Sequence, residues 1–303
     1  MVPASAAQIC SVTACSATAA GMASDETASG AQSIAHSRPL RFGVLGAANI
    51  NAAAIIHPCQ QSPTEAAIVA LAARDPKRAQ EHIEQHGLTG CQISPDYQSL
   101  VERDDIDAVY NQSPNGLHFE WTMAALRAGK HVLCEKPFAS NAEEARQMVA
   151  LAAERNLVLM EAFHWFYHPL RERIQAVMAS GELGTVSEVN SNFMCSADHP
   201  SFRNKQQIRY NSALAGGTNM DLGTYALDVL RTLMGRGKGA PKVLWAEAKR
   251  WEEDPEIDDG MAGELQVGQT IWLSPLSGAL LPFRTPFSLE RRRCYMPEPA
   301  AFP

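Results

Sequence analysis

Two segments far apart in the chain carry side chains that could act together on an alcohol. Glu135-Lys136-Pro137 follows an apolar run, and Pro137 restricts the backbone that carries the Lys136 ammonium. Asp221 and Tyr225 are four residues apart in a helical pattern, which predicts that they share one face. A nearby ammonium favours a phenolate, so Tyr225 is a candidate general base and Lys136 a candidate donor to the oxygen that becomes a carbonyl. A solvated loop lysine and a packed core tyrosine are the alternatives.

The elements that must position these residues alternate between strand-like and helical patterns. Apolar runs predict strands at 42–45, 68–72, 108–111, 131–134 and 157–161. Helical periodicity predicts helices at 47–61, 76–87, 97–102 and 117–128, and another that opens at Ser140 or Asn141. Strands joined by helical crossovers predict an α/β fold with a doubly wound parallel Rossmann sheet. Lys136 would then lie at the carboxyl edge of that sheet, where such folds bind ligands.

The turn after the first predicted strand is a candidate nucleotide-binding turn. The hexapeptide GAANIN, which begins at Gly46, is a degenerate form of G-x-G-x-x-G. Gly46 can make the tight turn, and Ala48 allows the backbone to approach a pyrophosphate at a helix N-terminus. Asn49 and Ile50 complete the predicted cofactor contacts of this turn. Asn51 is bulkier than the usual Gly or Ala at the third position, so an ordinary strand-to-helix turn stays open on this motif alone.

The end of the second predicted strand bears on the choice between NAD and NADP. Arg74 stands where an NAD site would place a carboxylate on the ribose hydroxyls. A guanidinium matches a 2′-phosphate through paired hydrogen bonds, and Asp75 is left to turn the chain. NADP is therefore predicted, with a solvated surface arginine as the alternative.

Taken together, these segments resemble the Gfo/Idh/MocA oxidoreductase family, and within it the branch of dimeric dihydrodiol dehydrogenases and NADP-dependent D-xylose 1-dehydrogenases. The resemblance is carried by VLGAANI, SPNGLHFEWTMAALRAGKHVLCEKP, EAFHWFYHP and GGTNMDLGTYALDVLR, in that order. It implies a catalytic Lys136, a Tyr225 in the place of the family's catalytic Tyr or His, and an Asp221 that orients the substrate. It also implies that the cofactor is lined by Ser113, Pro114, Asn115, His118, Glu135 and Lys136.

The resemblance implies hydride transfer to NADP from a sugar, such as a D-xylose-like aldose at C1, or from a trans-dihydrodiol. The implied substrate contacts are Glu161, Phe163, His164, Trp165 and Asn219. His164 and His168 could also suit a metal, with Glu161 nearby. No third His or Cys follows at ligand spacing, however, and hydride transfer needs no metal, so none is predicted.

The pattern changes after Pro169, which predicts a second, α+β domain with an open, mostly antiparallel sheet. The predicted division is a disordered tail at 1–38, a dinucleotide-binding domain at 39–165, a substrate-binding domain at 166–270 and an irregular segment at 271–303. The last segment is rich in proline and shows no sustained alternation. We therefore expect an incomplete second sheet with an exposed edge, from a chain truncated or read in another frame at its end.

The composition favours a small-molecule partner in a reducing compartment. The formal net charge is -7, the sequence pI is about 5.7 and the basic residues are dispersed, which does not suit nucleic acid. No window is long and apolar enough for a membrane span. The seven cysteines form no Cys-x-x-Cys pair, so a cytoplasmic location is expected. A homodimer through the C-terminal sheet is a further expectation.

Two other functions stay open from the sequence. One is a different reaction of the same family, such as inositol or glucose dehydrogenation or biliverdin-type reduction. The other is a non-catalytic NADP-binding regulator, for which the unusual C-terminal segment is the argument.

Overall fold

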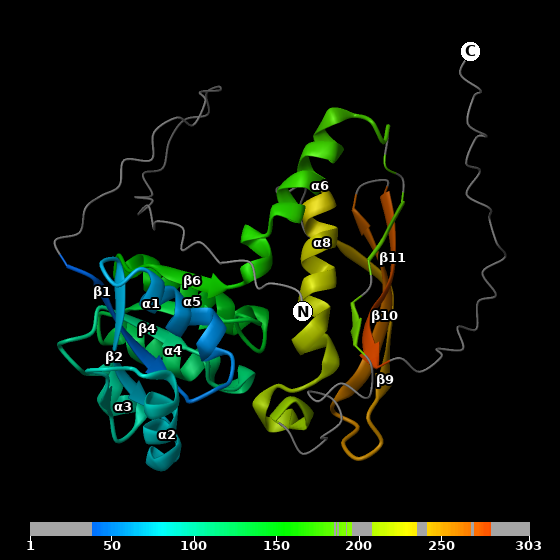
Figure 1. Ribbon diagram of the computed structural model, residues 1–303. Coiled ribbons are helices and arrows are strands. Elements are labelled where there is room, and N and C mark those ends of the chain that lie inside the picture. The colour runs from blue at the N-terminus through cyan, green and yellow to red at the C-terminus, as the bar shows by residue number, and fades with distance from the viewer. Residues whose placement is uncertain are drawn as a thin grey trace.

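The chain forms two β-sheets with helices around and between them (Figure 1). The computed structural model describes residues 38–184, 186, 188–191, 193–195, 208–234, 241–267 and 270–279. The first sheet has six strands in the order β3-β2-β1-β4-β5-β6, and every pair is parallel. Its strands are β1 Leu40–Leu45, β2 Ala66–Ala72, β3 Gln92–Ile93, β4 Ala108–Asn111, β5 His131–Glu135 and β6 Leu159–Ala162. The predicted doubly wound parallel sheet is confirmed.

Helices cover both faces of this sheet because alternate strand residues point to opposite sides. Val109 packs in a cluster with helices α3 to α5, whereas its neighbour Tyr110 packs in the cluster of η1, α1 and α2 on the other face. The helices are η1 Ala52–Ile56, α1 His57–Gln61, α2 Pro76–His86, α3 Tyr97–Val101, η2 Asn115–Leu117, α4 His118–Arg127 and α5 Ala142–Glu154. Asp75, Asp96 and Asn141 cap the starts of α2, α3 and α5, as their side chains accept backbone N–H groups.

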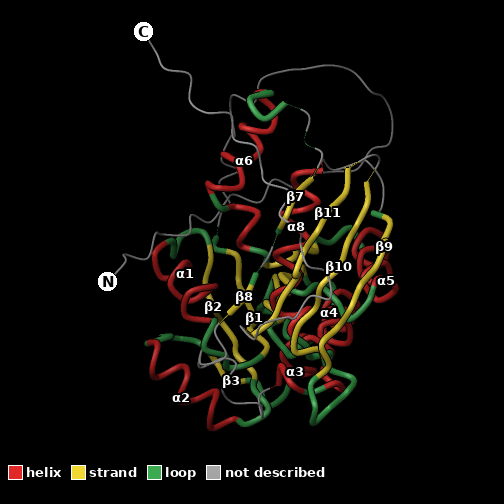
Figure 2. Tube along the Cα trace, turned by 90° about the vertical axis from the view of Figure 1, so that its right-hand side faces the viewer, coloured by secondary structure: helices red, strands yellow, loops and turns green. Residues whose placement is uncertain are grey.

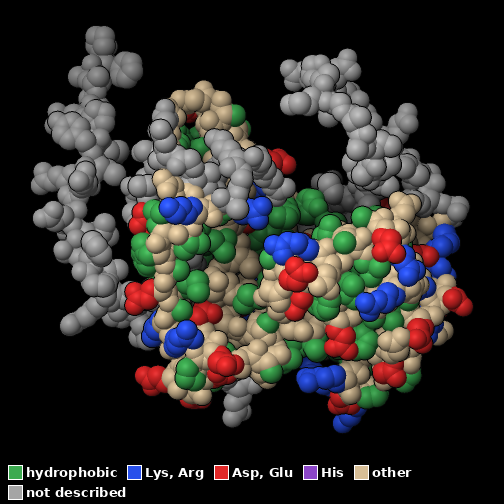
Figure 3. Space-filling view, turned by 180° about the vertical axis from the view of Figure 1, so that it is seen from behind, with side chains coloured by type: hydrophobic (Ala, Val, Ile, Leu, Met, Phe, Trp, Pro, Cys, Tyr) green, Lys and Arg blue, Asp and Glu red, His purple; other side chains and the backbone are tan. Residues whose placement is uncertain are grey.

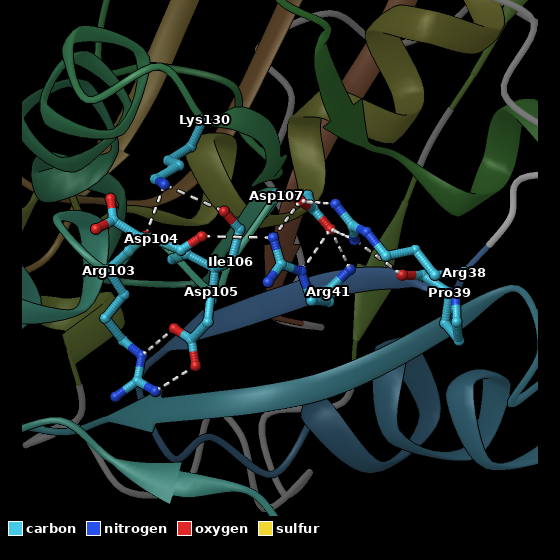
Figure 4. A network of polar contacts seen from close by, with 9 residues as sticks. All are labelled: Arg38, Pro39, Arg41, Arg103, Asp104, Asp105, Ile106, Asp107 and Lys130. Carbon is cyan, nitrogen blue, oxygen red and sulfur yellow. Dashed lines mark hydrogen bonds and ion pairs between the residues drawn. The ribbon is translucent and has the colours of Figure 1, made fainter.

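A polar network lies at the end of the sheet where β1 and β4 begin (Figure 4). The Asp107 carboxylate accepts hydrogen bonds from Arg38 at 2.6 Å and from Arg41 at 2.8 Å. Lys130 donates to the carbonyls of Arg103 and Ile106, at 2.6 and 3.1 Å. These bonds satisfy side chains and backbone at this end of the sheet. The candidate site residue Lys136 lies at the opposite end of the sheet, beyond the carboxyl end of β5.

The second sheet is mixed and carries two helices on one side (Figures 1 and 2). Strands β9 to β11 are antiparallel, and β7 and β8 pair with β11 in parallel. The elements are α6 Pro169–Ser180, β7 Glu188–Asn190, β8 Met194–Cys195, α8 Thr224–Met234, β9 Lys242–Arg250, β10 Asp258–Val267 and β11 Thr270–Ala279. Ala226 and Leu230 of α8 pack on Leu265 of β10, which holds the helix on the sheet.

Strand β11 corrects the expectation of an irregular segment from residue 271 onward. Residues 271–279 continue the sheet despite Pro275, which lacks a backbone N–H. The ladder with β10 shifts register between Met261 and Ala262, and Ala262 is the partner of Pro275. A bulge next to the proline therefore accommodates it. Residues 280–303 and the predicted tail up to residue 37 lie outside the described residues.

The surface shows charges of both signs interspersed among polar and apolar side chains on the face seen in Figure 3. None of the helices that the structure describes has the length and apolarity that a bilayer crossing would require.

Candidate active site

Lys136, at the carboxyl edge of the first sheet, reaches across to the segment that precedes α8. Its Nζ donates to the Asp221 carboxylate at 2.7 Å and to the Asp221 backbone carbonyl at 2.9 Å. The other carboxylate oxygen accepts from Nε of Arg209 at 2.8 Å. Burial alone would raise the pKa of Asp221, but the charges of Lys136 and Arg209 hold it below its ordinary value. Asp221 is therefore an ionised carboxylate between two cations.

A tight approach to β10 fixes the segment that carries Asp221. This segment ends in one π-helical turn, η6 Asn219–Gly223, which continues into α8. The Asp258 carboxylate, at the start of β10, accepts from the backbone N–H of Asn219 at 2.7 Å. Gly217 has φ +122°, and a Cβ there would collide with Asp258 Oδ1. Glycine at this position therefore lets the start of η6 rest on the carboxylate.

Tyr225, on the first turn of α8, lies in an aromatic pocket beside Lys136. Its ring centroid is 4.9 Å from that of Phe163, 5.6 Å from that of His164 and 5.1 Å from that of Phe193, which stacks on it. Lys136 Nζ lies 5.2 Å from the ring centroid. The predicted ammonium and phenol thus come together, although they are 89 residues apart in the chain (225 − 136).

The electrostatics of Tyr225 differ from the sequence-based expectation of an acidified phenol. Burial, followed by the carboxylates of Glu135, Asp221 and Glu161, raises the pKa of Tyr225 above its ordinary value of 10. The Lys136 ammonium, 5.2 Å from the ring centroid, is itself paired with the Asp221 carboxylate. The expectation was wrong because the residue types predicted the cation but not the burial and the three carboxylates around the ring. The phenol keeps its proton at neutral pH.

Glu135 and Glu161 are held by hydrogen bonds on the first-sheet side of the site. The Tyr110 hydroxyl donates to Glu135 Oε1 at 2.5 Å, and the backbone N–H of Lys136 donates to Glu135 Oε2 at 3.1 Å. Glu161 accepts from the backbone N–H of Phe138 at 3.1 Å. Burial raises the pKa of Glu161. Glu161 is therefore harder to ionise than an exposed glutamate, and it is one of the acids whose charge acts on Tyr225.

The turn after β1 has the shape that a pyrophosphate requires. Gly46 has φ +108°, and a Cβ built on it would lie 3.4 Å from the Gln112 amide and 3.6 Å from the Tyr97 hydroxyl. Both Gln112 and Asn51 donate to the Gly46 carbonyl. Ala48 is partly buried, whereas Asn49 and Ile50 are exposed at the tip of the turn. A dinucleotide therefore fits this turn.

The end of β2 suits a 2′-phosphate better than free ribose hydroxyls. Arg74 is exposed beyond β2, and Arg78 of α2 reaches back to the Ala47 carbonyl at 3.4 Å. The Asp75 carboxylate is occupied as the cap of α2, since it accepts from Lys77 N at 2.9 Å. One oxygen of Asp75 is therefore engaged by the helix start, and the Arg78 guanidinium lies beside the turn.

The predicted cofactor residues in the loop after β4 make hydrogen bonds to different parts of the chain. Ser113 is buried, and its hydroxyl donates to Asn111 Oδ1 at 2.7 Å. His118 is enclosed, with its ring nitrogens 2.8 Å from the carbonyls of Ser113 and Pro137. Asn115 instead donates its side-chain amide to the Ala215 carbonyl at 3.1 Å, in the segment before η6. The Asn115 side chain therefore bonds to the segment that precedes η6, in the part of the chain that carries the second sheet. Pro114 directly precedes η2.

Two predicted substrate residues, Trp165 and Asn219, contact neighbours in their own segments. Trp165 stacks on His168 at 5.5 Å, within the short turn η3 His164–Tyr167. The Asn219 side-chain oxygen packs against Gly223 of the same turn of η6. Among the residues that the structure describes, no group of three or more His, Cys, Asp or Glu side chains could hold a metal.

Several residues of the site were not found from the sequence. Arg209, Phe193 and Asp258 reach Asp221, Tyr225 and η6 from separate segments, so no local spacing pointed to them. Gln112 directly precedes the predicted cofactor segment. Its place at the carboxyl end of a predicted strand was the one available signal.

Comparisons with known proteins agree with this geometry. The family model described as "Oxidoreductase family, NAD-binding Rossmann fold" matches residues 40–163, and the "GFO/IDH/MocA C-terminal domain" matches residues 172–274. The chain is 38% identical over 230 residues to D-xylose 1-dehydrogenase (NADP(+)) 2 of Haloferax volcanii, covering 75% of this chain and 66% of that protein. It is 33% identical over 227 residues to trans-1,2-dihydrobenzene-1,2-diol dehydrogenase of Bos taurus, covering 75% and 64%.

Among solved structures, the 3-ketoreductase KijD10 of Actinomadura kijaniata, in complex with NADP and TDP-benzene, matches with a TM-score of 0.71 and 30% identity. The match covers 80% of this chain and 70% of that one. The chain spans less than two thirds of the length of the two curated relatives above, at 66% and 64%.

Proposed function

The chain belongs to the Gfo/Idh/MocA oxidoreductase family, and we propose that it is an NADP-dependent dehydrogenase acting on a CH–OH group. The proposed substrate is a sugar, such as a D-xylose-like aldose at C1, or a trans-dihydrodiol. The observation that carries the proposal is the meeting of Lys136, Asp221 and Tyr225 at the carboxyl edge of the first sheet. The relatives named as xylose and dihydrodiol dehydrogenases support the substrate class.

The proposed chemistry assigns a separate task to each of the three side chains. Tyr225 exchanges the proton of the substrate hydroxyl. Lys136 directs two of its three N–H donors to Asp221, and the third is available to the substrate oxygen. Asp221 fixes the ammonium and, with Arg209, orients the substrate. Phe163 and Phe193 exclude water beside the phenol, and His164 offers a polar contact at the rim.

The proposed cofactor is NADP, held by the Gly46 turn and by the guanidinium groups of Arg74 and Arg78. When bound, its nicotinamide accepts or donates the hydride. Two observations support NADP over NAD: the Asp75 carboxylate is used as a helix cap, and Arg78 lies at the turn. The NADP-dependent relatives support the same choice.

A substrate panel tests the proposal. NADPH formation is measured with aldoses and trans-diols, with NAD as the control nucleotide. Lys136→Ala and Tyr225→Phe should each lower turnover by at least about 100-fold while NADP+ binding largely survives. Tyr167→Phe, an exposed tyrosine on η3, is the matched control. Normal turnover in either site variant overturns the assignment, and tight NADP+ binding without turnover on any substrate favours a regulator.

A second candidate function is 3-ketoreduction of a nucleotide-linked sugar. The chain is 36% identical to a dTDP-3,4-didehydro-2,6-dideoxy-alpha-D-glucose 3-reductase of Saccharopolyspora spinosa, and KijD10 is a 3-ketoreductase. A dTDP-linked keto sugar with NADPH therefore belongs in the panel.

The proposed assembly is a homodimer through the second sheet. Val243, Leu244 and Trp245 of the edge strand β9 are 57%, 41% and 43% exposed, which leaves an apolar edge available for a second copy. Sedimentation of the unaltered chain and of Val243→Lys checks this proposal.

We also propose a cytoplasmic location, supported by the free thiols of Cys59, Cys91 and Cys134. The proposed domain division at residues 165 and 166 is supported by the two matched ranges.

A further inference from the structure

Asn51, the residue that departs from the dinucleotide fingerprint, is fully buried at the start of η1. Its Nδ2 lies 3.1 Å from the Gly46 carbonyl oxygen and 3.1 Å from Nε2 of His82 on α2. An amide nitrogen carries two hydrogens and accepts none, so it donates one to each partner. His82 must therefore accept at Nε2, which requires a neutral ring with its proton on Nδ1.

The Gly46 carbonyl is the point at which this side chain acts on the turn. Gln112 also donates to it, and the Gly46 N–H donates to the Ala72 carbonyl at 2.7 Å. The turn is thus fixed from β2, from β4 and, through Asn51, from α2. A pyrophosphate is bound by the backbone of such a turn, so the orientation of Gly46 sets the geometry offered to the nucleotide.

We infer that Asn51 and His82 are positioning residues for the dinucleotide turn, and that protonation of His82 releases the turn and weakens nucleotide binding. The inference rests on the proposed binding of NADP. A protonated imidazole carries hydrogens on both nitrogens, so Nε2 can no longer accept from Asn51. Rotation of the amide would turn its oxygen, which has no partner among the described residues, toward His82. The same rotation would place that oxygen against the Gly46 carbonyl.

The surroundings of His82 set the pH at which this change occurs. Burial lowers the pKa of His82 below its ordinary value of 6.5, and the charges of His86 and Arg78 on the same helix lower it further. The His86 ring lies 4.6 Å away, edge to face. The neutral ring is therefore present at and above neutral pH, and the bond to Asn51 is lost as the pH falls below 6.5 through the lowered pKa.

The test measures NADP+ dissociation constants by tryptophan fluorescence from about pH 8 to about pH 5. The ligand's own 2′-phosphate titrates in this range for every variant, so the difference between each variant and the unaltered chain is the quantity of interest. At the acid end the unaltered chain should lose about 3- to 10-fold more affinity than His82→Gln, whose amide oxygen can accept from Asn51 but does not titrate. Asn51→Gly, which restores the fingerprint glycine, should also lack the extra loss.

His86→Gln should shift the midpoint of the extra loss to higher pH because it removes a positive neighbour of His82. His57→Gln, an exposed histidine on α1, should leave the midpoint in place. Nitrogen NMR of the His82 ring gives an independent measurement and should show Nε2 unprotonated at about pH 8. The opposite tautomer, or identical curves for His82→Gln and the unaltered chain, overturns the inference. Absence of NADP+ binding at every pH overturns both it and the proposed function.

Discussion

The proton on Tyr225 determines the pH at which each direction of the proposed reaction runs best. Burial and the nearby carboxylates hold the pKa of Tyr225 above 10. The protonated phenol can donate to a carbonyl in reduction, but it must lose that proton before it can act as a base in oxidation. We expect the reduction rate to stay level through neutral pH and the oxidation rate to climb into the alkaline range. Rate profiles in both directions check this, and an oxidation rate that already levels off near neutral pH contradicts it.

Asp221 is the neighbour of Tyr225 whose removal should move that alkaline limb. The carboxylate raises the pKa of Tyr225 and also neutralises Lys136. In Asp221→Asn the lost negative charge and the unpaired ammonium both favour the phenolate, so the oxidation limb should shift to lower pH. Asp228→Asn is the matched control because Asp228, three residues after Tyr225, pairs with Arg171 at 3.8 Å. An unmoved limb in Asp221→Asn would show that the ion pair does not govern this proton.

At the scale of elements, the contact between η6 and β10 depends on the missing side chain at Gly217. Gly217→Ala should lower the free energy of unfolding by about 2–3 kcal/mol, because φ +122° is a glycine conformation and the new Cβ meets Asp258. Gly181→Ala, after α6, is the control. Its φ is +78° and nothing lies within 4 Å of the new Cβ, so about 1 kcal/mol is expected. Urea unfolding of both variants measures the difference, and equal costs would mean that Asp258 gives way.

Some of these elements could be predicted from local sequence signals, and others could not. The strand at 108–111 was predicted at its observed bounds and the helix from Pro76 at its observed start, because apolar runs and capping residues are local signals. The two-residue strand β3 is too short to show alternation, and β11 was missed because a proline argues against a strand, whereas the bulge that accommodates Pro275 is a feature of the paired ladder. Lys136 and Tyr225 were found by local motifs. Arg209 and the raised pKa of Tyr225 arise from tertiary contacts that no window of sequence contains.

At the scale of the whole molecule, the two lobes meet through contacts that lie beside the proposed site. Lys136 is bonded to Asp221, and Asn115 is bonded to Ala215. Between these bonds, η2 packs against η5 Ser212–Leu214, where Gly116 faces the Leu214 backbone. The loop predicted to line the cofactor therefore also contacts the segment that leads to Asp221 and Tyr225, the side chains proposed to act with Lys136.

Gly116→Ala tests this coupling with a single methyl group. Gly116 does not have a positive φ, so alanine costs its own backbone little, but the new Cβ would lie 2.9 Å from Leu214 backbone atoms. A displacement of a few tenths of an ångström between the lobes would separate Lys136 from Asp221 and Tyr225. We expect turnover to fall by about 10- to 100-fold, because misplacement of about 1 Å in a site can lower a rate by about 100-fold. We expect little change in NADP+ affinity. Gly129→Ala, which meets no atom within 4 Å, controls for general destabilisation. If NADP+ affinity falls as much as turnover, the Asn115 loop acts on the cofactor itself rather than on the spacing of the two lobes.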